Sequence, residues 1–397
     1  MGSALDTFND FMDSTGPAFL TGADDIVNEA VKNNYLLRRF MRGKGPSETL
    51  QGGSTIKDSI LFDEKSTFQY YQPNETFTWS NPQVLDQWEI DWRFSVDHMS
   101  WTDHEIELNV GGQGRNARHS TYKTIKRSKE QRLWTSLFNG MEDGLFAAPS
   151  NADMEGTSGT KPYSLPTFIT GATNGASFGA SNEIQNIDPT AEAKWRNKTA
   201  TYDPDSITTF DALADVIFPA FDSMYMDVQF MPPPSHQEYF ENPSLNAMFI
   251  ACSRRGQRAY VGCLRASQDT FVTGSRQDPS YMKPQYSGVD LEYVSELDTA
   301  AIYDNTFEGT GTGVDESSGT TDAGPRYYFI NANYLKFVFH TTRYFYQHPT
   351  MKHPNQPFTT VMPVDCWHNF ICRSRQRQGL IGPDGGILST TLVPEAS

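Results

Sequence analysis

The sequence has few cysteines and no long apolar run. Its four cysteines are too few and too widely spaced for a disulfide framework, and none belongs to a Cys-x-x-Cys pair: Cys252, Cys263, Cys366 and Cys372. We therefore expect buried free thiols, no structural zinc and a reducing compartment. No stretch of about 18 or more apolar residues occurs, and the first residues lack the basic and apolar regions of a signal peptide. No membrane partner is expected.

Motifs of the common enzyme classes are also missing. The sequence contains no Walker A sequence, HExxH, GxSxG or protein-kinase signature. The segment GQGRNA at 112–117 has the spacing of a dinucleotide fingerprint. It is followed by basic and polar residues rather than by the apolar helix of a βαβ unit, and is interpreted as a turn. His348 and His353 are close in sequence, but their proline-flanked spacing does not suit a metal site. We assign no catalytic, cofactor-binding or metal-binding residue.

The composition predicts a folded protein with segregated charge. The 397 residues correspond to about two to three structural units. The 26 Phe, 18 Tyr and 7 Trp supply a large apolar core. The net charge of -16 argues against a protein that coats nucleic acid, yet residues 32–44 and 115–132 are strongly basic. These segments could pair with acidic surfaces of other copies, or they could be ordinary solvated faces.

Hydrophobic periodicity predicts both strands and helices. Residues 68–110 alternate in the manner of strands and predict a long hairpin, whereas 127–146 have helical spacing. Further elements are expected as a helix beginning near 210 and ending before the MPPPS run, a strand at 247–251, a helix at 254–271 and strands after 325. Residues 304–325 are rich in Gly, Ser, Thr and acidic residues, which predicts a surface loop.

Aromatic residues are concentrated in the predicted hairpin. Its aromatic side chains are Phe68, Tyr70, Tyr71, Phe77, Trp79, Trp88, Trp92, Phe94 and Trp101. Such a hairpin needs a cover for its apolar face, and a neighbouring subunit is the expected one. The candidate inter-subunit contacts are therefore Trp79, Trp88, Trp92 and Trp101, together with the basic residues Arg38, Arg39, Arg42 and Lys44 of the N-terminal segment.

The C-terminal third resembles a known family. The run AGPRYYFINANYLKFVFHTTRYFYQHP is followed by CWHNFICRSRQRQGLI, whose ending consists of Trp367, Asn369, Cys372, Arg375, Arg377, Gln378 and Gly379. This region resembles the C-terminal region of tailed-bacteriophage major capsid proteins. The order of elements is also similar to that of the Hong-Kong-97-type fold.

The resemblance implies an α+β capsid fold with a defined division of the chain. The implied parts are an N-terminal arm at 1–55, an extension-loop β-hairpin at 56–118, a peripheral domain with a long spine helix at 119–203, an axial domain at 204–364, and a return to the peripheral domain at 365–397.

The implied function is structural rather than enzymatic and needs no cofactor. Copies of the chain would form hexamers and pentamers and close an icosahedral or prolate head shell around double-stranded DNA. The implied partners are a separate scaffolding protein, a portal and, as a further candidate, a decoration protein, with only non-specific contacts to DNA. The protein would be assembled in the bacterial cytoplasm and located in the virion. Two alternatives stay open: another virion component (portal, tail or decoration protein) and a carbohydrate-active hydrolase.

Overall fold

The computed structural model describes most of the chain and divides it into two compact units. The described residues are 34–41, 47–62, 68, 70–72, 85–108, 115–146, 159–169, 183–202, 209–228, 248–268, 284–299 and 326–383. The first unit contains the described parts of 95–141 and 342–366, and the second those of 33–94, 142–341 and 367–397.

The described segments contain both helices and strands. The helices are α2 (Tyr35–Met41), α3 (Asp103–Leu108), α4 (Arg115–Phe146), α6 (Leu165–Phe168), α7 (Phe210–Val228), α8 (Arg254–Gln268) and α9 (Glu296–Thr299). The strands are β1 (Ser47–Leu50), β2 (Thr55–Leu61), β3 (Leu85–Asp91), β4 (Arg93–Thr102), β5 (Lys198–Tyr202), β6 (Met248–Cys252), β7 (Gln285–Tyr286), β8 (Val289–Tyr293), β9 (Tyr327–Asn331), β10 (Leu335–His340), β11 (Tyr346–Gln347), β12 (Met351–His353), β13 (Gln356–Cys372) and β14 (Gly379–Pro383).

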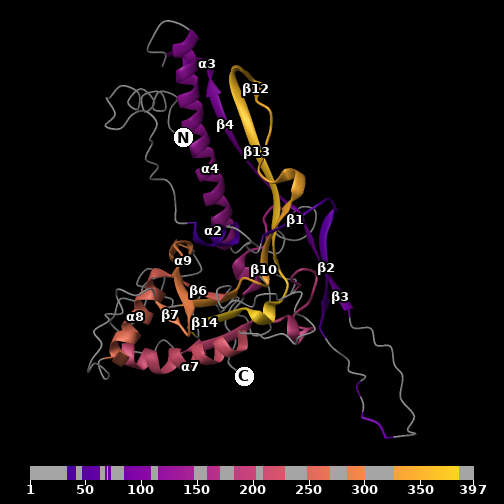
Figure 1. Cartoon of the computed structure of the whole chain (residues 1–397), viewed down its shortest axis with the longest axis vertical. Coiled ribbons are helices and arrows are strands. Elements are labelled where there is room, and N and C mark those ends of the chain that lie inside the picture. The colour runs from indigo at the N-terminus through magenta and orange to yellow at the C-terminus, as the bar shows by residue number, and fades with distance from the viewer. Residues whose placement is uncertain are drawn as a thin grey trace. The chain divides into compact units, whose positions relative to one another are not determined.

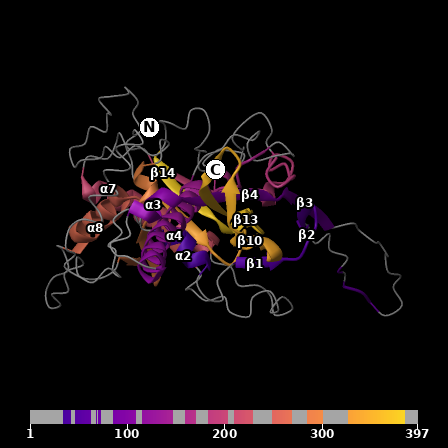
Figure 2. The same cartoon turned by 90° about the horizontal axis from the view of Figure 1, so that it is seen from above.

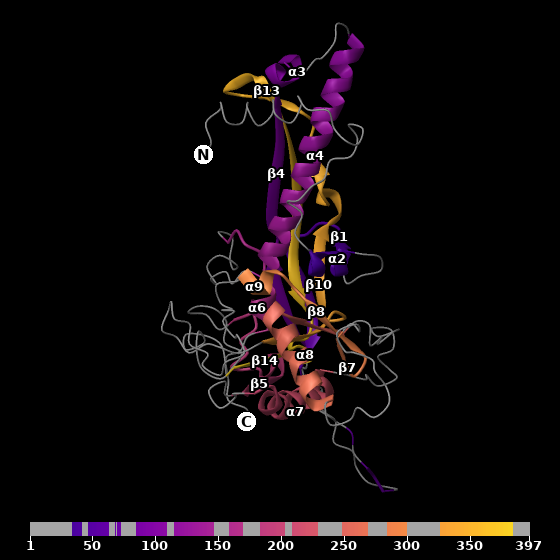
Figure 3. The ribbon, with the colours of Figure 1, turned by 90° about the vertical axis from the view of Figure 1, so that its left-hand side faces the viewer.

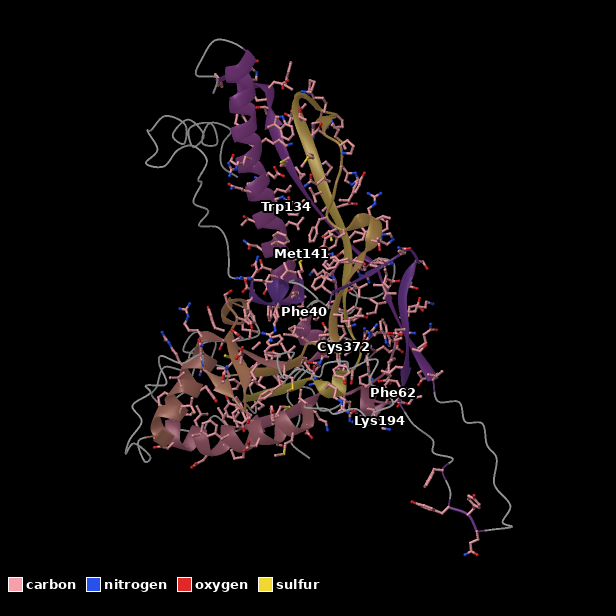
Figure 4. All side chains as sticks on the ribbon, in the orientation of Figure 1. Phe40, Phe62, Trp134, Met141, Lys194 and Cys372 are labelled. Carbon is pink, nitrogen blue, oxygen red and sulfur yellow. The ribbon has the colours of Figure 1, made fainter. Side chains whose placement is uncertain are left out.

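In the first unit, helix α4 runs beside strands β4 and β13 (Figures 1 and 3). Leu133, Leu137 and Met141 are buried at a spacing of four residues, which places them on one side of the helix. Trp134 lies one heptad before Met141 (Figure 4), and its ring stacks on that of Phe138 at 5.7 Å. One side of α4 therefore supplies the core of this unit.

A lysine on α4 ties the helix to the neighbouring segments. Lys129 Nζ donates a hydrogen bond to the Ser100 carbonyl of β4 at 2.9 Å and forms an ion pair with Glu105 of α3 at 2.8 Å. Glu105 also accepts a hydrogen bond from the Thr102 amide, while the Thr102 hydroxyl accepts one from the Glu105 amide. This reciprocal arrangement is a capping box, and it explains why α3 begins directly after β4.

In the second unit, a mixed six-stranded sheet carries two helices on one face. The strand order is β5-β14-β9-β6-β8-β7. Helices α7 and α8 lie side by side (Figures 1 and 2). Phe221 of α7 is the centre of their contact with the sheet, because its ring lies 5.8 Å from that of Tyr260 on α8, 4.9 Å from Tyr327 and 5.1 Å from Phe329 on β9. This cluster is part of the apolar core of the second unit.

Gly379 of β14 illustrates how closely α7 approaches the sheet. A β-carbon at this position would collide with the Met224 side chain and lie 3.2 Å from Val228. Only glycine therefore allows the last turns of α7 to pack against β14.

The second unit also contains the sheet segment β1-β10-β13. Strand β1 is parallel to β10, and β10 is antiparallel to the C-terminal half of β13, with Phe337 opposite Phe370. The Phe370 ring is 5.4 Å from that of Phe40 on α2 and 5.7 Å from that of Phe168 on α6. Aromatic side chains from four distant segments thus form one cluster.

The aromatic hairpin differs from the predicted one. Strand β3 pairs antiparallel with β2, from Thr55 opposite Asp91 to Leu61 opposite Leu85, while β4 pairs with β13. The prediction of a hairpin within 68–110 was therefore wrong in its pairing. Alternation identifies strands and their faces, but it contains no information about which strand is the partner.

Candidate assembly surface and its anchors

The predicted tryptophan contacts are buried within the chain itself. Trp88, Trp92 and Trp101 are each 5% exposed or less. Trp88 and Ile90 lie on the same face of β3, and Ile56 lies opposite Ile90 on β2, so this face of the hairpin is already covered. Trp88, Trp92 and Trp101 thus contribute to the core of their own chain, and their expected role in contacts between subunits stays a prediction. Trp79 lies outside the described residues.

The basic candidates are only partly described. The Arg39 guanidinium lies over the Phe249 ring of its own chain, 4.3 Å from the centroid, and donates a hydrogen bond to the Tyr35 hydroxyl at 2.8 Å. Arg38, on the other side of α2, is exposed. Arg42 and Lys44 lie outside the described residues. Arg38 is thus the described basic candidate that faces solvent, whereas Arg39 stabilises the position of α2.

The end of the β2–β3 hairpin exposes large apolar side chains. Leu61 and Leu85 lie directly opposite each other in the last pair of the hairpin. The connection between the strands contributes three exposed aromatic residues. Together these residues, hereafter the hairpin-end surface, are between 53% and 90% exposed: Leu61, Phe68, Tyr70, Tyr71 and Leu85. Exposed apolar side chains at a hairpin end and in its connection are typical of a surface that another molecule covers.

The three aromatic residues of this surface belong to the predicted aromatic hairpin, but they are not among the contact candidates predicted from the sequence. Alternation cannot distinguish them from Trp88, because both sets belong to the same aromatic segment. The Leu61–Leu85 pair was missed altogether, since only the strand register brings the two leucines together.

The hairpin is anchored to other segments of the second unit next to its Leu61–Leu85 end and within β3. Lys194 Nζ donates a hydrogen bond to the Phe62 carbonyl at 2.7 Å, and the Phe62 ring meets the Trp195 ring edge to face at 5.9 Å (Figure 4). The Glu89 amide donates a hydrogen bond to the Gln185 carbonyl at 3.3 Å. The hairpin is therefore fixed along β2 and β3, while its exposed end is available for a contact.

Arg375 of the C-terminal motif is a buried anchor. It is 0% exposed and donates hydrogen bonds to the carbonyls of Phe168 at 2.8 Å and Trp195 at 2.9 Å, and to Asn197 Oδ1 at 3.2 Å. Burial lowers the pKa of its guanidinium to about 10. The three nitrogens of the planar group thus bond two other segments, one at Phe168 and one at Trp195 and Asn197.

Two further motif residues bond the backbone in the same way. Asn369 accepts a hydrogen bond from the Tyr163 amide at 3.1 Å and donates one to the Asp91 carbonyl at 2.7 Å. Gln378 accepts one from the Asn331 amide at 2.9 Å and donates one to the Asn331 carbonyl at 3.1 Å. These side chains, which support the family resemblance in sequence, hold distant backbone segments together.

The titratable groups of the described residues show no arrangement for metal binding. No group of three or more His, Cys, Asp or Glu side chains among them could hold a metal ion. All four cysteines are free and buried, as predicted. Burial raises the pKa of the Cys263 and Cys372 thiols to about 12 and that of Cys366 to about 11. Among the described helices, none is both long and apolar enough to cross a membrane.

Comparison with known proteins identifies the fold. No family model matches the sequence, and no curated protein matches it. The structure is similar to a capsid chain of cyanophage A-1(L), with a TM-score of 0.52, 9% identity, and coverage of 92% of this chain and 95% of that one. It is equally similar to a capsid chain of a native GTA particle, with a TM-score of 0.52, 9% identity, and coverage of 94% and 99%.

The chain therefore has a mixed α/β fold of the kind found in capsid proteins. The likeness to these two capsid chains extends over more than nine-tenths of the chain. It confirms the capsid fold expected from the C-terminal residues.

Proposed function

We propose that this protein is the major capsid protein of a tailed phage, a structural subunit that closes the head shell around double-stranded DNA. The observation that carries the proposal is the capsid fold, which covers more than nine-tenths of both this chain and the compared chains. The internal position of the C-terminal motif supports it, because the side chains of Arg375, Asn369 and Gln378 hold distant backbone segments of this fold together.

The division of the chain into an arm (1–55), an extension loop (56–118), a peripheral domain (119–203 and 365–397) and an axial domain (204–364) belongs to this proposal. The β2–β3 hairpin lies at the start of the proposed extension-loop range, and the long helix α4 would be the spine helix. Since α4 begins at Arg115, the extension loop would end before that residue.

The hairpin-end surface gives the proposal a specific contact. A two-stranded ribbon is marginally stable alone, and exposed apolar side chains at its end favour a covered position. We assign this surface to the contact with a neighbouring copy of the chain, in hexamers and pentamers. Each copy would contribute the same surface, so one contact would be repeated throughout the shell.

The remaining partners follow from the proposed role and the charge. A scaffolding protein, a portal and a decoration protein are candidates for contacts during assembly. With a net charge of -16, contacts with packaged DNA would be sparse, independent of base sequence and weakened by salt.

Electron microscopy of the expressed protein tests the function. The full chain, alone and co-expressed with the products of neighbouring genes, should form closed shells. A double variant, Tyr70→Asp with Tyr71→Asp, should keep the wild-type circular dichroism spectrum but fail to assemble, because it places two carboxylates in an apolar contact.

Gln72→Asp is the control for negative charge, since it adds one carboxylate to an exposed polar position of the same segment. It should assemble like the wild type. Rings or tubes from the wild-type protein would instead indicate a portal or tail component. Normal shells from the double variant would show that the hairpin-end surface takes no part in the contact between copies.

A further inference from the structure

Helix α4 places one carboxylate in the interior of the second unit. Glu142 is 0% exposed, and its two oxygens accept hydrogen bonds from consecutive amides of α2, Leu36 at 3.0 Å and Leu37 at 2.7 Å. The first amides of a helix have no acceptor within the helix itself. Glu142 supplies that acceptor for α2, so one side chain of α4 determines where α2 begins.

Among the described residues, no cation forms an ion pair with this carboxylate. The charged groups that act on it are Glu296 on α9 and Asp143 on α4, and both are acidic. Arg39 of α2 is engaged with Phe249 and Tyr35 instead, and Arg38 is exposed. Strand β10, which packs against α2, contributes the titratable side chains of Lys336 and His340. Within the described part of the chain, none of these four cations forms an ion pair with Glu142.

Apolar contacts provide the rest of the attachment of α2. Leu36, Leu37 and Phe40 are each 3% exposed or less, and the Phe40 ring meets the Phe370 ring at 5.4 Å. This part of the attachment does not depend on pH. The Glu142 contact is different, because its strength depends on whether the carboxyl group is ionised.

We propose that α2 is a pH-dependent strap, which is held most firmly when Glu142 is protonated and loosens when Glu142 ionises. The reason is hydration. A buried carboxylate without a cation is unfavourable, even with two amide donors, whereas movement of α2 away from α4 would expose the carboxylate to water. Ionisation therefore favours the open position of α2, and protonation favours the closed one.

The direction of the pH effect on α2, and the pH range in which it occurs, follow from proton linkage. Burial raises the pKa of Glu142 from 4.5 to about 7 in the closed structure, against the opposing effect of the two amide donors. An exposed glutamate has the lower value, so the closed state binds the proton more tightly than the open state. Closure is thus fully favoured below about pH 4.5 and is weakened as the pH rises to about 7. The opening equilibrium should increase on the order of a hundredfold over this range.

Hydrogen–deuterium exchange of the full-length subunit tests the strap and requires no shell formation. Amides of residues 36–41 should be protected at about pH 5 and lose protection on the order of a hundredfold by about pH 8, after correction for the intrinsic pH dependence of exchange. In Glu142→Gln, the side chain cannot ionise, and protection of these amides should not change with pH.

The control is Glu107→Gln, the same substitution at an exposed position of α3, which should behave like the wild type. If Glu142→Gln fails to fold, the pH dependence of amide protection in the wild type tests the proposal by itself. Protection of residues 36–41 that is constant or increases with pH in the wild type would overturn the proposal. If protection of these amides still depends on pH in a folded Glu142→Gln variant, the proposal would also be overturned.

Discussion

Buried polar side chains that bond the backbone are the main feature at the scale of single residues. Arg375, Asn369 and Gln378 together bond six backbone groups and one side chain, all distant in sequence. Because Arg375 has the capacity for several directed hydrogen bonds, it can join three segments at once. A lysine has a single nitrogen and could not replace this geometry.

Arg375→Ala should destabilise the subunit strongly. The variant removes the donor that Arg375 provides to two buried carbonyls and to Asn197 Oδ1, and it creates a cavity, so the free energy of unfolding should fall by about 3–5 kcal/mol. Chemical denaturation of the purified subunit measures this change. Arg258→Ala, at an exposed position of α8, should change the free energy of unfolding by less than about 0.5 kcal/mol. Equal effects in the two variants would contradict the anchoring role.

Sequence reasoning at this scale identified residue types better than their surroundings. It predicted four buried thiols correctly, since an isolated cysteine in a reducing compartment is usually a small core residue. It did not predict the burial of Trp88, Trp92 and Trp101 within their own chain, and their expected contact with a neighbour stays a prediction. A strand pattern shows which side chains share a face, but the tertiary structure decides which face is covered.

At the scale of elements, helices were predicted more accurately than strand pairings. The apolar spacing of 127–146 predicted the second half of α4, but the helix begins at Arg115. Its first part is polar and basic, so it carries no apolar periodicity, although Arg, Lys and Gln favour helices. The β2–β3 pairing could not be predicted because residues 62–84 separate the two strands and no short turn sets the register.

Helix α7 offers a test of element stability. Pro219 lies inside the helix at an exposed position and has no amide to donate to the Asp215 carbonyl. Pro219→Ala should therefore raise the free energy of unfolding by about 1–3 kcal/mol, as measured by thermal and chemical denaturation. Val216→Ala, on the same helix, serves as a control with an expected change of less than about 1 kcal/mol. A loss of stability in Pro219→Ala would mean that a proline-induced bend fits α7 to the sheet.

At the scale of the whole molecule, both units are built from separated stretches of the chain. The first unit combines described parts of 95–141 and 342–366, and the second combines three stretches. The similarity to capsid chains could be anticipated from about 60 residues near the C-terminus because those residues include the anchors of the fold. Which stretches of the chain make up each unit could not be anticipated, since this depends on pairings between distant strands.

The buried thiols provide a test of the folded molecule as a whole. At about pH 8, none of the four cysteines should react with iodoacetamide in the native subunit, because all are buried and burial raises the pKa of three of them. All four should react in guanidinium chloride. Mass spectrometry counts the modified residues in each case. Rapid modification of one native thiol would show that its surroundings open under native conditions.

The parallel pairing of β1 with β10 has a consequence for synthesis on the ribosome. Ser47 pairs with Phe337, and β5 pairs with β14 close to the end of the described chain. At about 5–20 residues per second, the partner of β1 emerges on the order of 15–60 seconds after β1 itself. During this interval β1 has no partner in its final sheet, and the second unit can close only after most of the chain has been translated. Folding of this chain is therefore completed late in translation or after it.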